Sequence, residues 1–344
     1  MQDKVIVSII VPCYKAKEEW VKRALLSVRN QTYKSYELIV VDDGSSKEYH
    51  DILVSSVTEN NEHLITIKNS GVSAARNIAV QSAKGDFICF LDVDDWLEPD
   101  FLERALLFQA KNNADFVIGG TVMCSDYIIH DFKRADIGNY ECFEGEQIPG
   151  LIPHLVGTTS IISLDVPMGY IGRGPWSRLI RRSLALSINF DENLALGEDI
   201  VWNVRVLGQA NRVCLVKECW YCYWWNDDSK TKSFNDKICY ETESHINALV
   251  DILDLEDREV YLSLISRIYD QVNESWDRCL MVLRKTDAAQ HRRMKEYIYH
   301  TGYWKLLCSS KTFKLSSLKM KIVVLLCRTR LFYFVKGIKH KIKL

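Results

Sequence analysis

The sequence lacks any run of 18 consecutive apolar residues, which is about the length that a helix needs to cross a membrane. It has no internal repeat and no low-complexity segment, which excludes a repeat protein. Because Lys4 directly precedes a strand-like run, we expect no signal peptide. The 344 residues are 47% hydrophobic and 26% charged, and this composition is typical of a soluble globular protein with one large domain or two.

Acidic residues are absent from residues 301–344, although this segment contains eleven lysines and arginines. The net charge of −1 for the whole chain hides this asymmetry, because the first 300 residues carry 33 bases and 45 acids. A basic tail on an acidic body indicates an anionic surface as a partner.

A disulfide framework is not expected from the eleven cysteines, because their number is odd and several, such as Cys89, lie inside apolar runs. The pattern predicts buried free thiols in a reducing cytosol. Cys219 and Cys222 have CxxC spacing but no second pair at zinc-finger distance, so we expect them to pack in the core.

Strand and helix patterns alternate over the first 120 residues, which predicts a mostly parallel sheet with helices on its faces. Residues 240–300 are predicted to be all-helical. Ligands of such sheets bind beyond the carboxyl ends of the strands. The expected strands are Val5–Val11, Glu37–Val41, Leu64–Ile67, Phe87–Leu91 and Asp115–Gly119, and the expected helices are Glu18–Asn30, Val72–Ala83 and Glu98–Asn112.

The most informative segment is DFICFLDVDD at residues 86–95, where a buried strand runs into Asp92, Asp94 and Asp95. Clustered carboxylates suit Mg²⁺ or Mn²⁺, which would leave positions open for phosphate oxygens. The alternative is that Asp94 or Asp95 caps a helix that begins at Trp96.

Two further polar clusters have both a structural and a functional interpretation. Asp42-Asp43-Gly44-Ser45 follows the second strand, where it is either a turn or part of a ligand site. Glu198 and Asp199 open an amphipathic helix, where acids are favoured by the helix dipole and could also act as a general base.

Four motifs, in order along the chain, together resemble the inverting family 2 glycosyltransferases of the GT-A fold. They are VSIIVPCYKAKEEW, LLSVRNQTYKSYELIVVDDGSS, NSGVSAARNIAVQSAKGDFICFLDVDDWLEPDFLE and GEDIVWNVRVL. The resemblance is strong over residues 5–120 and recurs at 173–232. It implies a Rossmann-like catalytic domain at 1–232, with a nucleotide-sugar half at about 1–120 and an acceptor half at about 121–232. A helical C-terminal region would follow at 233–344.

The resemblance also implies roles on the nucleotide side. Pro12 and Tyr14 would lie against the base, and the Asp43 carboxylate would accept a hydrogen bond from uracil N3–H. The implied metal site is the DxD element, with Asp94 on Mn²⁺ or Mg²⁺ and Asp92 on the ribose or a metal-bound water. Two supporting positions are Arg76, near the base and phosphates, and Asp95.

On the acceptor side, the resemblance implies Asp199 as the catalytic base, with Glu198 as the second choice. Trp176 and Lys232 would bind on the acceptor side, and Lys232 could also reach the diphosphate. The structural alternatives are a surface salt bridge for Arg76, an acid pair in the first turn of a helix for Glu198 and Asp199, and core packing for Trp176.

The basic tail is amphipathic, because Leu331, Phe334, Ile338 and Ile342 fall on one helical face, with Lys336, Lys339 and Lys343 off it. This pattern is typical of a helix that lies on an anionic membrane. The alternative is a terminal helix that packs on the body or pairs with a second subunit in a homodimer.

The motifs and the tail together predict a cytoplasmic enzyme on the inner face of the plasma membrane. It would transfer a hexosyl or N-acetylhexosaminyl group from a UDP-sugar, with inversion, to a glycan or lipid-linked acceptor in polysaccharide assembly. The alternatives are a dTDP- or GDP-sugar donor and a non-catalytic protein that binds sugar nucleotides. Nucleic acid is not an expected partner, because the motifs at the strand ends are acidic.

Overall fold

A computed structural model describes residues 5–124, 140–157, 172–224 and 234–342. The contacts divide the chain into two compact units. The first contains residues 1–155 and 167–226, and the second contains residues 156–166 and 227–344.

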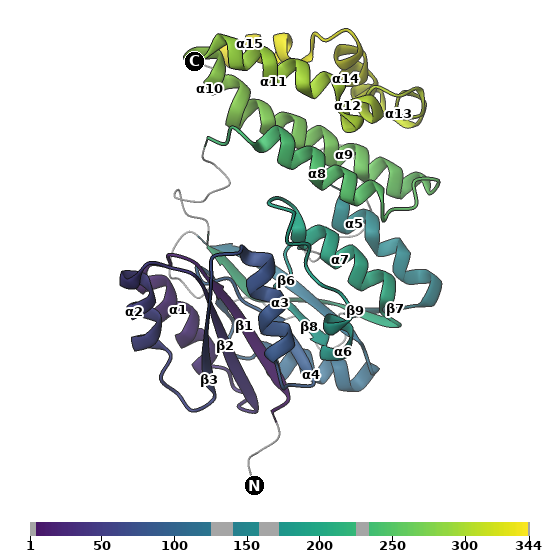
Figure 1. The fold of residues 1–344 in the computed structure, drawn as a ribbon. Helices are drawn as coiled ribbons and strands as arrows, with labels where there is room; N and C mark the ends of the chain where they lie inside the picture. The colour runs from purple at the N-terminus through teal and green to yellow at the C-terminus, as the bar shows by residue number, and fades with distance from the viewer. Residues whose placement is uncertain (1–4, 125–139, 158–171, 225–233, 343–344) are drawn as a thin grey trace. The chain divides into compact units, whose positions relative to one another are not determined.

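The first unit begins with the predicted parallel sheet (Figure 1), in which β1 (Val7–Cys13) lies between β2 (Tyr36–Asp43) and β4 (Phe87–Phe90). A fourth strand, β3 (Glu62–Ile67), pairs with β2, also in parallel. All residues of β1, β2 and β4 are buried, which explains their continuous apolar runs. The connecting helices are α1 (Glu18–Arg29), α2 (Lys47–Ser56) and α3 (Val72–Ser82).

Beyond β4 the sheet becomes mixed, in the strand order β3-β2-β1-β4-β8-β6-β9-β5 for the described residues. β8 (Arg178–Arg181) is antiparallel to both of its neighbours, β4 and β6 (Phe116–Cys124). The long strand β9 (Arg212–Trp224) runs parallel to β6. The other elements here are β5 (Trp96–Leu97), α4 (Phe101–Asn112), β7 (Tyr140–Glu144), the 3₁₀ helix η1 (Gly145–Leu151), α5 (Ile152–Val156), α6 (Arg182–Leu186) and α7 (Glu198–Gln209).

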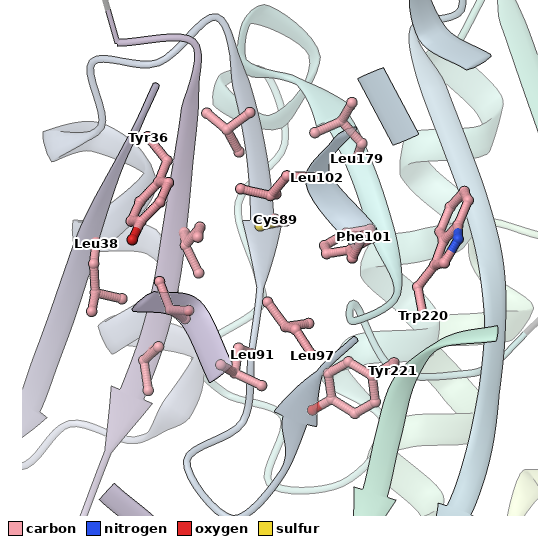
Figure 2. Close-up of a cluster of buried hydrophobic side chains, with 14 of the residues drawn as sticks. Tyr36, Leu38, Cys89, Leu91, Leu97, Phe101, Leu102, Leu179, Trp220 and Tyr221 are labelled. Atoms are coloured by element: carbon pink, nitrogen blue, oxygen red, sulfur yellow. The ribbon is translucent and has the colours of Figure 1, made fainter. Parts of the chain in front are cut away.

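The main core of the first unit lies on one face of this sheet (Figure 2). Successive side chains of a strand point to opposite faces, so Val7, Ile9 and Val11 of β1 share this core with apolar residues of α1 and α4. Along the sheet, the core extends as far as Trp220 and Tyr221 of β9, which lies toward the edge opposite to β3. It therefore connects β9 to the strands whose ends carry the acidic motifs.

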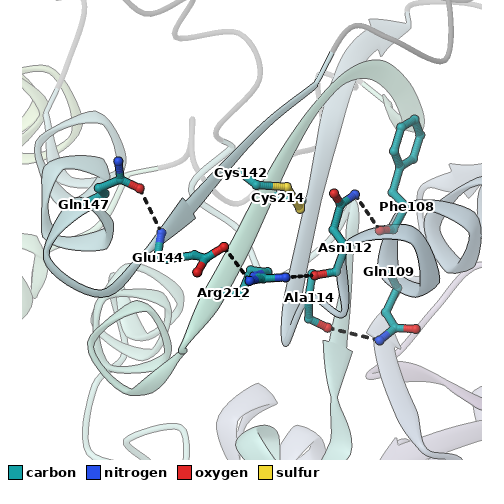
Figure 3. The surroundings of a disulfide bond; sticks show 9 residues. All are labelled: Phe108, Gln109, Asn112, Ala114, Cys142, Glu144, Gln147, Arg212 and Cys214. Carbon is teal, nitrogen blue, oxygen red and sulfur yellow. Dashed lines mark hydrogen bonds and ion pairs between the residues drawn. A yellow bond between two sulfur atoms is a disulfide. The ribbon is translucent and has the colours of Figure 1, made fainter.

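The prediction that the cysteines are buried free thiols is wrong for one pair. Cys142 of β7 and Cys214 of β9 form a disulfide (Figure 3). The two residues are directly opposite each other in the antiparallel register, with Cα atoms 4.3 Å apart. The register of two distant strands cannot be read from a cysteine count, so this pair could not be predicted. The other described cysteines are free thiols, and most are buried.

The second unit is helical, as predicted, apart from a π-helical turn at Trp276–Leu280. Its helices are α8 (Ile238–Val250), α9 (Arg258–Ser275), α10 (Met281–Thr286), α11 (Ala288–His300), α12 (Gly302–Leu307), α13 (Ser310–Leu315), α14 (Leu318–Arg328) and α15 (Phe332–Ile342). Among the described residues, none of the helices has both the length and the apolar character of a membrane span.

The last helix, α15, packs on its own unit more than the sequence pattern predicts. Tyr333 is buried and stacks on Trp276, with ring centroids 5.4 Å apart. Lys336, expected beside the apolar face, donates to the carbonyl oxygen of Asn273 at 3.0 Å and pairs with Asp277 at 3.3 Å. Leu331 and Phe334 are exposed, as the pattern requires. The side chains of Ile338, Lys339, Ile342 and Lys343 lie outside the described part.

Candidate active site

The loops after β1 and β2 meet at the carboxyl edge of the sheet. Pro12 is the penultimate residue of β1, and Tyr14 follows the strand with its side chain 40% exposed. The backbone N–H of Lys15 donates to the Ser45 hydroxyl oxygen at 3.0 Å, which joins the two loops. The sheet therefore brings together Pro12, Tyr14 and the Asp42–Ser45 segment, as the sequence predicts.

The two aspartates at the end of β2 differ in their contacts. Asp42 accepts from the backbone N–H of Ser45 at 3.0 Å and lies 2.8 Å from His50 Nδ1, so it stabilises the turn. Asp43 accepts from the backbone N–H groups of Ser70 at 2.6 Å and Gly71 at 2.9 Å. The segment can therefore be both a turn and part of a ligand site, because Asp42 stabilises the turn and Asp43 is available for a ligand.

Gly44 is required at this turn for two reasons. Its φ of +67° lies in the left-handed region, which L side chains rarely adopt. A Cβ atom there would also lie 2.4 Å from the backbone nitrogen of Asn69. The glycine thus allows the loop before α3 to approach Asp43.

The acidic segment after β4 does not cap a helix. Trp96 and Leu97 form strand β5, and the next helix, α4, begins only at Phe101. The capping alternative is therefore wrong. The carboxylates of Asp92 and Asp95 instead make different contacts, Asp92 with Arg76 and Asp95 with Tyr221.

Asp95 is buried and faces β9, where it accepts from the Tyr221 hydroxyl at 2.5 Å and from the Trp224 backbone N–H at 2.8 Å. The same tyrosine oxygen accepts from the backbone N–H of Asp92 at 3.1 Å. Burial and the charges of Asp94 and Asp92 raise the pKa of Asp95 well above its ordinary value. Tyr221 therefore fixes both ends of the acidic segment, a role that the sequence analysis missed.

Arg23 of α1 holds the middle of this segment and was also missed. Its guanidinium donates to the carbonyl oxygen of Asp94. It lies 4.6 Å from the ring centroid of Trp96 and 4.3 Å from that of Trp224, at cation–π distance. Arginine at one position of an amphipathic helix gives no sequence signal of such a contact, because charged residues are common there.

Arg76 of α3 connects the two acidic motifs. It is buried, and it pairs with Asp92 at 3.0 Å and with Glu198 at 3.2 Å. Burial alone would lower its pKa, but the charges of Asp92, Glu198 and Asp199 outweigh burial and the pKa is raised. Arg76 does form salt bridges, but they lie inside the site and not on the surface.

The charge of the Asp94 carboxylate is only partly offset by that of Arg23. Burial, followed by the charge of Asp92, raises the pKa of Asp94 to about 6. A divalent cation between Asp92 and Asp94 would offset this repulsion, and both residues supply the hard oxygen donors that Mg²⁺ and Mn²⁺ prefer. The described residues contain no group of three or more His, Cys, Asp or Glu side chains placed to hold a metal. A metal held by one or two carboxylates and a substrate diphosphate needs no such group, so the donor set fits.

Glu198 and Asp199 begin α7, whose N-terminal neighbour Gly197 has a φ of +75°. The Asp199 carboxylate accepts from the backbone N–H of Ile200 at 2.7 Å. The buried Asn203 donates to the carbonyl oxygens of Asp199 at 2.8 Å and Arg173 at 2.9 Å. The start of α7 is therefore held against the segment before β8. Glu198 is engaged by Arg76 at 3.2 Å, and the charge of Asp199 also acts on Arg76.

Trp176 stacks on Tyr221, with ring centroids 5.0 Å apart and an interplanar angle of 17°. Its indole also lies where a Cβ atom on Gly172 or Gly174 would be, so two glycines make room for it. These contacts agree with the packing interpretation, although the side chain remains partly exposed. Lys232 lies outside the described residues.

Comparison with known proteins agrees with this geometry. Residues 8–166 match the family model described as Glycosyl transferase family 2. An uncharacterized glycosyltransferase of Haemophilus influenzae is 37% identical over 121 residues, which are 35% of this chain and 48% of that protein. The cholesterol galactosyltransferase of Borreliella burgdorferi is 26% identical, over 73% of this chain and 68% of that protein. The chain spans about a third to a half of the length of the first curated relatives that it matches.

Among solved structures, residues 1–349 of TarS from S. aureus superimpose with a TM-score of 0.64 at 18% identity, over 98% of this chain and 91% of that one. The same TarS fragment has also been solved with UDP-GlcNAc. The likeness in fold covers the helical C-terminal region as well as the sheet. Residues 8–166 therefore match a family 2 glycosyltransferase domain, and the chain has the GT-A fold with a helical C-terminal region.

Proposed function

We propose that this chain is an inverting glycosyltransferase that moves a sugar from a UDP-sugar to a hydroxyl of a glycan or lipid-linked acceptor. The observation that carries the proposal is the meeting of Tyr14, Asp43 and Asp94 at one sheet edge, with Arg76 joining Asp92 to Glu198. The pathway would be surface polysaccharide assembly, such as capsule, O-antigen or exopolysaccharide. Residues 1–232 would form the catalytic domain, with the nucleotide bound by residues 1–120.

The donor's base would bind between Tyr14 and Asp43. Two backbone N–H groups and, at 3.4 Å, the Asn69 side-chain amide donate to the Asp43 carboxylate. Acceptor capacity remains, because an ionised carboxylate has about four lone-pair sites. Uracil N3–H would donate to it, and the exposed ring of Tyr14, with Pro12, would lie against the base. The UDP-GlcNAc complex of TarS supports a UDP-sugar as donor.

The diphosphate would lie near Asp92 and Asp94, with Mn²⁺ or Mg²⁺ between them. When bound, the cation neutralises the negative charge that develops on the departing diphosphate. Arg76 keeps Asp92 oriented, and Tyr221 and Arg23 keep the backbone of the segment in place. Asp95, directed at Tyr221, acts as support and does not touch the donor.

The acceptor hydroxyl needs a base, because its pKa is far above 7. We assign Asp199 to this role in preference to Glu198, because Glu198 is occupied by Arg76 at 3.2 Å. A positioned base typically contributes about 10²–10⁴-fold to the rate.

Trp176 and Lys232 remain proposed contacts on the acceptor side. A lipid-linked acceptor and an anionic membrane surface are proposed partners, and the cytoplasmic face of the membrane is the proposed location.

A panel of nucleotides in a thermal-shift assay tests the donor. We expect UDP with Mn²⁺ to raise the melting temperature more than GDP does, and Asp43→Ala to remove the shift. Because thymine N3–H can replace uracil N3–H, dTDP is the closest alternative. A larger shift with dTDP or GDP would change the donor assignment. No shift with any nucleotide would contradict the proposal.

A further inference from the structure

Helix α14 carries an apolar ridge that faces away from the second unit. Met320, Val324 and Cys327 form its buried side. On the opposite side, Leu318, Ile322 and Leu325 are 77%, 54% and 48% exposed. Their i, i+4, i+7 spacing places them on one line along the helix. This set of three residues is called the α14 ridge below.

The concentration of exposed apolar side chains near this ridge is unusual for the chain. Fourteen large apolar side chains are exposed in the described part. Five of them lie within residues 318–334, namely the three of the α14 ridge together with Leu331 and Phe334. Scattered single residues of this kind are normal on a protein surface, but a row of them indicates an interaction site.

Basic residues flank the ridge on both sides. With 3.6 residues per turn, Lys319 falls on one flank, and Lys321 and Arg328 fall on the other. The bases are anchored in part by the body of the unit, because Arg328 donates to the carbonyl oxygens of Cys308 at 2.8 Å and Ser309 at 2.9 Å. No acidic residue occurs between 301 and 344 to offset them.

We propose that the α14 ridge docks on an anionic lipid bilayer, with Leu318, Ile322 and Leu325 entering the headgroup region. An outward apolar line between two basic flanks is the arrangement of a helix that lies in the plane of a charged membrane. Charge complementarity favours lipid over a second copy of the chain, because a two-fold contact through this ridge would bring identical basic flanks together. The inference rests on the proposed membrane acceptor. It assigns a contact to α14 in addition to the face of Leu331, Phe334, Ile338 and Ile342 that the sequence pattern indicates.

The test uses the full chain and sedimentation with vesicles of phosphatidylcholine, with or without a third of phosphatidylglycerol. The ridge variant is Leu318→Ser/Ile322→Ser/Leu325→Ser. The control variant, Val54→Ser/Leu107→Ser, changes exposed apolar residues of the first unit. The wild type and the control should bind anionic vesicles at low salt, and less as salt rises, because screening shortens the range of the basic charges. The ridge variant should bind at least about tenfold more weakly, because it loses the three apolar side chains that would enter the bilayer.

The outcomes separate this inference from the proposed enzyme activity. The ridge variant should keep the wild-type melting temperature and the wild-type turnover of a UDP-sugar in solution, since the three side chains are exposed and lie outside the first unit. Equal vesicle binding by the wild type and the ridge variant would overturn the inference. A ridge variant that changes the mass in light scattering, with no effect on vesicle binding, would also overturn it and assign the ridge to a second copy. Vesicle binding without any sugar-nucleotide turnover would contradict the proposed enzyme activity but not the proposed membrane contact.

Discussion

Arg76 and Glu198 are 122 residues apart in the sequence, yet their side chains form an ion pair of 3.2 Å inside the site. The same guanidinium contacts Asp92 at 3.0 Å. One buried arginine thereby fixes the distance between the proposed metal segment and the helix that carries the proposed base. The geometry of transfer depends on that distance, because effective catalysis needs the reacting groups at near-contact separation.

The first prediction is that Arg76→Met destabilises the protein and abolishes turnover. The change leaves two carboxylates without their shared cation, and breaking a buried ion pair costs on the order of 3 kcal/mol of unfolding free energy. Urea unfolding measures this loss. Lys47→Met is the control, because it removes an ion pair with Asp51 whose partners are both exposed, and such pairs contribute little. Equal losses for the two variants would contradict the central position of Arg76.

The second prediction concerns the metal. Asp94→Asn should weaken UDP binding measured by calorimetry in Mn²⁺, because it removes a charged oxygen ligand. EDTA should have the same effect on the wild type and no further effect on the variant. Asp51→Asn, on the exposed face of α2, should bind UDP as the wild type does. Full activity of the wild type in EDTA would contradict the proposal that Asp92 and Asp94 hold a metal ion.

Tyr221 gives the third prediction, because its hydroxyl binds both Asp95 and the backbone of Asp92. Tyr221→Phe keeps the ring that stacks on Trp176 but removes one hydrogen-bond partner from the Asp95 carboxylate and one from the Asp92 backbone N–H. We expect a decrease in kcat/KM of about tenfold or more and a higher Mn²⁺ concentration for half-maximal activity. Tyr333→Phe, a change at a buried tyrosine of the second unit, should alter neither. A variant that loses only thermal stability, with an unchanged Mn²⁺ requirement, would reduce Tyr221 to a packing residue.

The sequence predicted the parallel part of the sheet because β1, β2 and β4 are continuous apolar runs followed by polar turns. It also placed Asp43, Asp92 and Asp94 at one edge, since that follows from the order of parallel strands. It did not predict Tyr221 or the disulfide between Cys142 and Cys214, because both depend on the register of β9. A buried apolar run such as that of β9 reads equally well as helix or strand, and its partners lie far away in the sequence.

The fourth prediction concerns pH and the second unit. His245 is buried, and burial, with a smaller contribution from Arg267, lowers its pKa from 6.5 to about 3. The unfolded chain therefore binds a proton below pH 6.5 that the folded chain does not, so this residue makes stability fall as the pH falls from 6.5 toward 3. At pH 5 the loss is about 2 kcal/mol. His245→Gln should flatten the dependence of unfolding free energy on pH between 7 and 5, whereas His300→Gln, at an exposed histidine, should not. Identical slopes for all three proteins would refute the assignment.

The most direct test of the account is the release of UDP from a panel of UDP-sugars by the purified protein with Mn²⁺, with water in the place of the acceptor. The account predicts release from at least one UDP-sugar. It also predicts that Asp199→Asn lowers kcat by at least about 10²-fold while UDP affinity and the melting temperature stay unchanged. A larger loss with Glu198→Gln than with Asp199→Asn would exchange the two roles. No release from any UDP-sugar by the wild type, or equal rates for the wild type and both variants, would contradict the assignment of this site as a glycosyltransferase centre.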